Sequence, residues 1–171
     1  KESGRVLLNT GEVNSLLSSY GIPVVKWKVA RDAVEAKKAA QEIGYPVVLK
    51  ADSASFNHKS DRNGVSLDIK DSETIDHEIK KMRNEFNIKY PSDLKFCVQQ
   101  YLKGGHEVII GAKEEKNLGH IIILGSGGIY TEVYKDVSFE ISPVSKPEAE
   151  AMVKSIKIYP ILSGIRGQKG A

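Results

Sequence analysis

The stretch Gly44-Tyr45-Pro46-Val47-Val48-Leu49-Lys50 predicts a helix stop followed by a strand that carries a lysine near its end. Its continuous apolar run is typical of a strand covered on both faces. A lysine held on such a rigid element can direct its ammonium group at a phosphate. The segment His58-Lys59-Ser60-Asp61 follows within a polar loop of about a dozen residues, a length that is often functional. Together the two stretches indicate phosphate chemistry.

The composition is that of an ordinary globular protein. Of the 171 residues, 40% are hydrophobic and 27% are charged, so the chain can bury a sizeable core. The 25 basic and 22 acidic residues are spread along the chain, which does not indicate nucleic-acid binding. No stretch approaches the roughly 18 apolar residues of a membrane span, and the first residues do not resemble a signal peptide. We expect a cytoplasmic enzyme or module with one buried thiol, Cys97.

Four stretches have the spacing and the end signals of amphipathic helices. The expected helices, with their inward-facing residues, are one after the candidate cap Thr10 (Val13, Leu16, Leu17, Tyr20), one after Asp32 (Ala33, Ala36, Ala40, Ile43), one over residues 72–86 (Ile75, Ile79, Met82, Phe86) and one after Ser145 (Ala149, Met152, Val153, Ile156).

Strands are expected between and after these helices. In the first half of the chain they cover about residues 25–29, 47–51 and 65–69, and a further strand over residues 95–102 leads into the glycine break Lys103-Gly104-Gly105, which we interpret as a hinge. Beyond the hinge, residues 107–112, 120–124, 130–134 and 137–142 are separated by short turns, which predicts an antiparallel sheet.

Several stretches, taken in their order and spacing, are similar to the motifs of one family. They are Tyr20-Gly21-Ile22-Pro23, Gly44 to Lys50, His58-Lys59-Ser60-Asp61, Gly64-Val65, Gly127-Gly128-Ile129-Tyr130-Thr131-Glu132-Val133, Lys135-Asp136-Val137-Ser138-Phe139 and Tyr159 to Gly167. The chain therefore resembles, over nearly its whole length, the ATP-grasp domain of the ADP-forming (NDP-forming) acyl-CoA synthetases, relatives of succinyl-CoA synthetase.

The resemblance implies an α+β fold of two lobes with a nucleotide cleft between them. We assign residues 1–94 to the first lobe and residues 95–171 to the second. Similar domains continue with an Asn-Pro motif and a later aspartate that hold magnesium, and neither is found before Ala171. We therefore expect a domain truncated at its C-terminus, with weak or no independent catalysis and with its metal ligands unknown.

The resemblance also implies which residues bind the nucleotide. Lys50 matches a phosphate-binding lysine, although a lysine at a strand end can also simply reach solvent. Glu107 matches a carboxylate near the ribose or the phosphates, and Arg166 matches a family arginine; a solvent-facing residue and a loop-anchoring ion pair are the respective alternatives. The other expected contacts are Lys59, the glycines Gly127 and Gly128, and the adenine segment Gln99, Gln100, Tyr101 and Leu102. Gln100 stands where the family commonly has an acidic residue, and Tyr101 and Leu102 could equally be core residues.

For catalysis the resemblance implies a phosphohistidine, and His58 is the matching residue. A neutral imidazole with the ordinary pKa of about 6.5 is a competent nucleophile, and the adjacent Lys59 can balance the charge of the phosphate. Glu132 and Asp136 are candidates to assist magnesium or to orient the phosphohistidine, or they are charges at the rim of the site.

The function implied is that of a ligase: acyl-CoA, ADP and phosphate give a carboxylic acid, CoA and ATP, or the reverse. The cofactors would be ATP or ADP with Mg²⁺, and CoA would bind to a partner domain or an alpha-type subunit. Two alternatives are a nucleotide-binding regulatory module fused to a protein acetyltransferase and an ATP-grasp carboxylate–amine ligase. The latter chemistry requires no phosphohistidine, so the histidine loop argues against it.

Overall fold

The computed structural model describes residues 8–52, 64–86, 94–128 and 136–164 and divides the chain into two compact units, Lys1–Leu102 and Lys103–Ala171. The division falls at the predicted glycine hinge, after Leu102 rather than after residue 94. The strand that begins at Lys95 belongs to the first unit because it pairs with two strands of that unit along its length.

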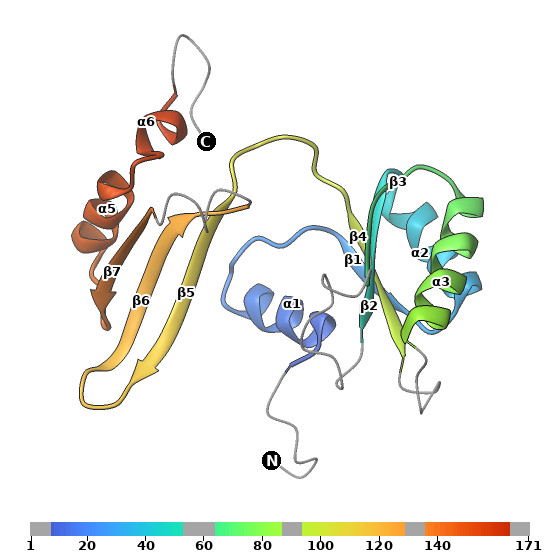
Figure 1. The fold of residues 1–171 in the computed structure, drawn as a ribbon, viewed down its shortest axis with the longest axis horizontal. Helices are drawn as coiled ribbons and strands as arrows, with labels where there is room; N and C mark the ends of the chain where they lie inside the picture. Colours follow the sequence, from blue (N-terminus) through green and yellow to red (C-terminus); the bar gives the residue numbers. More distant parts are fainter. Residues whose placement is uncertain (1–7, 53–63, 87–93, 129–135, 165–171) are drawn as a thin grey trace. The chain divides into compact units, whose positions relative to one another are not determined.

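The first unit is a four-stranded antiparallel sheet with helices on both faces (Figure 1). The strand order is β1-β4-β2-β3, so β4 and β2 are the central strands. The helices α2 and α3 lie on one face of the sheet, and α1 lies on the other. The elements are α1 (Thr10–Ser19), β1 (Trp27–Ala30), α2 (Ala33–Ile43), β2 (Val47–Asp52), β3 (Val65–Ile69), α3 (Ser72–Phe86) and β4 (Lys95–Gln100).

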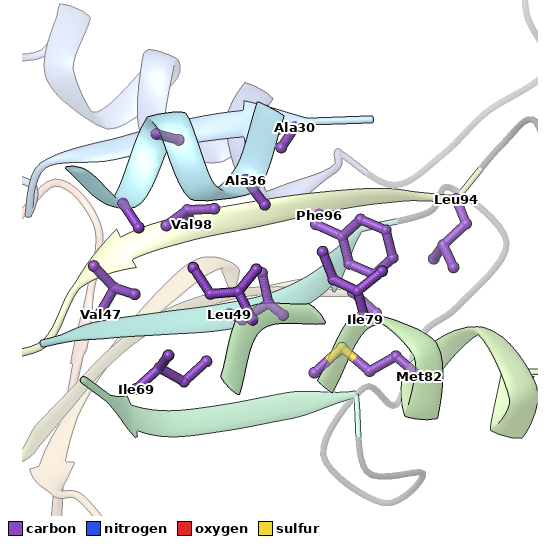
Figure 2. Packing of buried hydrophobic residues seen from close by; sticks show 14 of the residues in the cluster. Ala30, Ala36, Val47, Leu49, Ile69, Ile79, Met82, Leu94, Phe96 and Val98 are labelled. Atoms are coloured by element: carbon purple, nitrogen blue, oxygen red, sulfur yellow. The ribbon is translucent and has the colours of Figure 1, made fainter. Parts of the chain in front are cut away.

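The main core lies between the sheet and the pair α2 and α3. Alternate residues of β2 and β4, such as Leu49, Phe96 and Val98, are fully buried there. Figure 2 shows them beside Ile79 and Met82 of α3. Because successive side chains of a strand point to opposite faces, the residues between them belong to the other face of the sheet.

The helices of this core were predicted correctly. In α2, the Asp32 side chain accepts from the Glu35 N–H, and Gly44 ends the helix with φ of 95°. In α3, the four residues expected to face inward are all buried. These signals are local in sequence, which is why they predicted the bounds of both helices.

The apolar face expected for α1 was wrong. Its N-cap is Asn9, which forms a capping box with Glu12, and its buried residues are Gly11 and Asn14. Val13 and Leu16 are 38% and 47% exposed. The helix approaches β1 through Gly11, where a Cβ atom would lie 3.1 Å from Val29 and 3.2 Å from Trp27. The close approach of this small residue therefore decides the buried face.

The second unit is a three-stranded antiparallel sheet packed against two helices. The strand order is β5-β6-β7, and the predicted strand over residues 130–134 falls outside the described residues. A small core joins Leu124 to Met152 and Ile156, whereas Ala149 and Val153, which were expected to face inward, are exposed. The elements are β5 (Val108–Glu115), β6 (Gly119–Ser126), β7 (Val137–Ile141), α5 (Lys146–Ser155) and α6 (Tyr159–Leu162).

The N-terminus of α5 carries the predicted capping box. The Ser145 side chain accepts from the Glu148 N–H, and the Glu148 carboxylate accepts from the Ser145 N–H at 2.8 Å. Hydrogen bonds from the Ser145 hydroxyl and backbone lower the pKa of Glu148. Among the helices of the described residues, none has both the length and the apolar character needed to cross a bilayer.

Candidate functional site

Lys50 lies on the sheet face that points away from α2 and α3. Its neighbours in the strand, Leu49 and Ala51, are buried in the main core, so Lys50 is directed to the opposite face. Its partners in register are Cys97 of β4 and Val65 of β3. The lysine is half-buried and lies on β2, one of the two central strands of the sheet, on the face that also carries α1.

The predicted adenine segment begins on this same face. Gln99 is 7% exposed and stands opposite Val48. The Gln100 N–H donates to the Lys26 carbonyl at 2.8 Å, and the Tyr101 N–H donates to the Pro46 carbonyl at 3.2 Å. These two donors are therefore engaged within the unit, so an adenine contact through this segment must use other backbone groups.

Leu102 ends the segment with 63% of its surface exposed. Leu102 was predicted either to contact the adenine or to be a core residue. Its exposure shows that it is not a core residue of the described structure. Tyr101 is half-buried.

A pocket of about 380 Å³ lies within the second unit. One side is formed where β6 ends, and there the Gly127 N–H donates to the Glu107 carbonyl at 2.7 Å. Another part of the lining comes from the N-cap and first turn of α6. Three residue groups line it: Gly105, His106 and Glu107; Ser126, Gly127 and Gly128; Ile158 and Ile161.

Both predicted glycines are required by the close approach of Glu107. A Cβ atom on Gly127 would lie 2.8 Å from the backbone carbonyl carbon of Glu107. A Cβ atom on Gly128 would lie 2.6 Å from the Glu107 carboxylate, and Gly128 has φ of +66°. The structure thus brings together three of the residues predicted to bind the nucleotide.

We expect Gly127→Ala to lower the free energy of unfolding by about 1–3 kcal/mol, because the new methyl group must displace backbone atoms of Glu107. Denaturant unfolding measures this change. The matched control is Gly111→Ala in β5, where a Cβ atom would meet nothing within 4 Å. Equal losses of stability in the two variants would contradict the tight contact.

Asp136 lies next to the pocket but not in its lining. It is 4% exposed, and its carboxylate accepts from the Lys157 N–H at 2.6 Å and from the Ile158 N–H at 3.0 Å. Its burial does not fit a charge at the rim. A catalytic role for Asp136 stays a prediction.

Four predicted residues fall outside the described residues: His58, Lys59, Glu132 and Arg166. Conversely, the pocket is lined by His106, Ile158 and Ile161, none of which was among the predicted site residues. The position of His106 between the glycine hinge and Glu107 is the signal that could have identified it. Within the described part of the chain, no group of three or more His, Cys, Asp or Glu side chains could hold a metal ion.

Comparisons with known proteins agree on one family. Residues 1–171 match the family model described as ATP-grasp domain. The chain is 43% identical over 160 residues to the acetate–CoA ligase [ADP-forming] I subunit beta of Pyrococcus furiosus, which covers 92% of this chain and 69% of that protein. It is 41% identical over 171 residues to the 4-hydroxybutyrate–CoA ligase [ADP-forming] of Nitrosopumilus maritimus, over 99% of this chain and 24% of that longer protein.

A solved structure is also similar over nearly the whole chain. It is the acetyl-coenzyme A synthetase 1 of Candidatus Korarchaeum cryptofilum in complex with coenzyme A, Ca-AMPCP and HgCl+. The TM-score is 0.88 at 35% identity, with 99% of this chain and 75% of that chain covered. Other structures of the same synthetase contain a phosphohistidine segment, phosphorylated in one and pointing towards the nucleotide binding site in another.

Proposed function

This chain belongs to the ATP-grasp domain family, and on that premise we propose that it is the nucleotide-binding part of an ADP-forming acyl-CoA synthetase. The overall reaction converts acyl-CoA, ADP and phosphate into a carboxylic acid, CoA and ATP, or runs in reverse. A cytoplasmic location remains a prediction that goes with this function.

The position of Lys50 is the observation that carries the proposal. A lysine fixed at the centre of a sheet, on the face away from the main core, can hold nucleotide phosphates at little further entropic cost. Two unit charges about 4 Å apart interact by about 4 kcal/mol at an effective dielectric constant of about 20. This interaction is large enough to position a polyphosphate.

The pocket in the second unit also has groups that could contact a nucleotide. Gly127 and Gly128 allow Glu107 to pack closely against the end of β6, and the Glu107 carboxylate, which lines the pocket, can accept hydrogen bonds from ribose hydroxyl groups. Arg166 would add a planar, bidentate contact to a phosphate.

His58 would carry the phosphoryl group. In the direction of ATP formation, the neutral imidazole attacks the phosphorus of an acyl phosphate, a new N–P bond forms, and the carboxylate leaves with the electrons of the broken P–O bond. A β-phosphate oxygen of ADP then attacks the phosphohistidine, which regenerates the imidazole and gives ATP. Lys59 would balance the charge, and Glu132 would orient the ring.

CoA chemistry would take place on a partner domain or an alpha-type subunit, since the similar Pyrococcus proteins are beta subunits. Magnesium would accompany the nucleotide. The described residues do not supply a ligand set for it: Glu107 is one carboxylate in the pocket, and both oxygens of Asp136 already accept backbone hydrogen bonds.

The alternative function is that of a nucleotide-binding regulatory module fused to a protein acetyltransferase. The similar proteins are CoA ligases, which favours the catalytic proposal over an acetyltransferase-linked module.

Calorimetric titration of the chain with ADP and magnesium tests nucleotide binding, and we expect saturable binding at one site. The absence of heat at millimolar ADP would overturn the proposal.

A further inference from the structure

Asp136 is a buried carboxylate with two well-defined partners. Its oxygens accept from two successive backbone donors, the Lys157 and Ile158 N–H groups, at 2.6 and 3.0 Å. These donors lie just after α5, and Ile158 is the N-cap of α6, which has no cap from its own side chain. Burying a carboxylate is costly unless hydrogen bonds satisfy it, so this pair of contacts must persist in the folded protein.

The backbone of Asp136 makes a second connection. Its carbonyl accepts from the Ser126 N–H at 3.0 Å, directly before the two pocket glycines. A Cβ atom on Gly125 would lie only 2.7 Å from this carbonyl oxygen. One residue thus links the end of β6, the start of β7 and the connection from α5 to α6.

The segments that Asp136 links are two walls of the pocket. Ser126 and the following glycines form one wall, and Ile158 and Ile161 form the other. We propose that Asp136 is a positioning residue that fixes the distance between these walls, and that it acts on the bound nucleotide through the backbone rather than as a catalytic carboxylate. The identity of the ligand rests on the function proposed above.

The test combines nucleotide affinity with amide hydrogen exchange on the full chain. In Asp136→Asn one amide oxygen remains as an acceptor, but the NH₂ group faces the second N–H donor. We expect the Kd for ADP with magnesium to rise by about tenfold, the scale of one hydrogen bond to a charged group. We also expect faster exchange at Lys157, Ile158, Ser126 and Gly127.

A stability control separates positioning from a general loss of folding. Ser145→Ala removes the cap of α5 in the same unit but does not touch the pocket. It should lower the Tm and leave both the Kd and the exchange at Gly127 unchanged. A Kd within twofold of the wild type in Asp136→Asn, with faster exchange confined to Lys157 and Ile158, would overturn the proposal.

A second pair of variants replaces this test if Asp136→Asn does not fold. Lys157→Pro removes one donor to the carboxylate, and Ile156 before it already has φ of −75° and ψ of 144°, which suits a residue before proline. Lys157→Ala keeps the donor and removes only an exposed side chain. Weaker ADP binding in the proline variant alone supports the proposal, and equal binding in both overturns it.

Failure of the proposed function would look different. If the wild-type chain binds no ADP, the nucleotide assignment fails. In that case amide hydrogen exchange at Ser126 and Gly127 is the only test of the positioning role. Faster exchange in Asp136→Asn supports this role, and unchanged exchange rates overturn it.

Discussion

The Lys50→Met variant is expected to bind ADP about 30-fold more weakly than the wild type, a loss of about 2 kcal/mol, which is typical of a hydrogen bond to a charged group. Methionine keeps the unbranched apolar stem beside Cys97 and Val65, so the sheet should keep its packing. The loss then reports the missing ammonium group. Calorimetric titration with ADP and magnesium measures it.

The matched control is Lys28→Met in β1 of the same sheet. Lys28 forms an ion pair with Glu42 of α2, so its side chain lies on the face of the sheet covered by α2 and α3, opposite to that of Lys50. Its replacement should leave the ADP affinity unchanged. Wild-type affinity in Lys50→Met, or an equal loss in Lys28→Met, would contradict the phosphate contact and would indicate a general effect of charge.

The fold was predictable where its signals are local. The caps Asp32 and Ser145 and the helical spacing of the apolar residues in α3 predict elements because each signal acts within one or two turns. The place of β4 between β1 and β2 is different. It depends on pairing between strands far apart in sequence, so the residues of the strand alone did not assign it to the first unit.

The candidate site divides in the same way. Successive side chains of any strand point to opposite faces, so the predicted strand over residues 47–51 already places Lys50 and Leu49 on opposite faces of the sheet. The partners of Asp136 lie 21 and 22 residues further along the chain, and both are backbone groups. Backbone N–H donors cannot be identified from the side chains of a sequence. The sequence therefore identified Asp136 only as an acidic candidate for the site.

The burial of α1 shows a third kind of limit. Its apolar spacing predicted that Val13 and Leu16 face inward, but the helix packs through Gly11. A glycine contributes nothing to an apolar pattern, yet it permits the closest approach between a helix and a strand. The close packing at Gly11, and not the spacing of the apolar residues, therefore determines which face of α1 is buried.

The phosphotransfer role of His58 predicts a complete loss of one chemical signal. When the protein is incubated with γ-labelled ATP, magnesium and its CoA-binding partner, we expect acid-labile, base-stable label on the wild type. In His58→Asn the label should fall to background, because the asparagine amide keeps a similar size but has no nucleophilic nitrogen.

The control for this variant is His77→Asn, which removes an exposed imidazole from α3. Its labelling should equal that of the wild type, because we do not expect this exposed residue of α3 to contact the nucleotide. Wild-type labelling in His58→Asn would exclude His58 as the carrier and move the role to another residue. Loss of label in both variants would point to a folding defect, which the ADP titration of each variant detects independently. Since Lys50→Met weakens nucleotide binding and His58→Asn should not, the two variants separate holding the phosphates from carrying one of them.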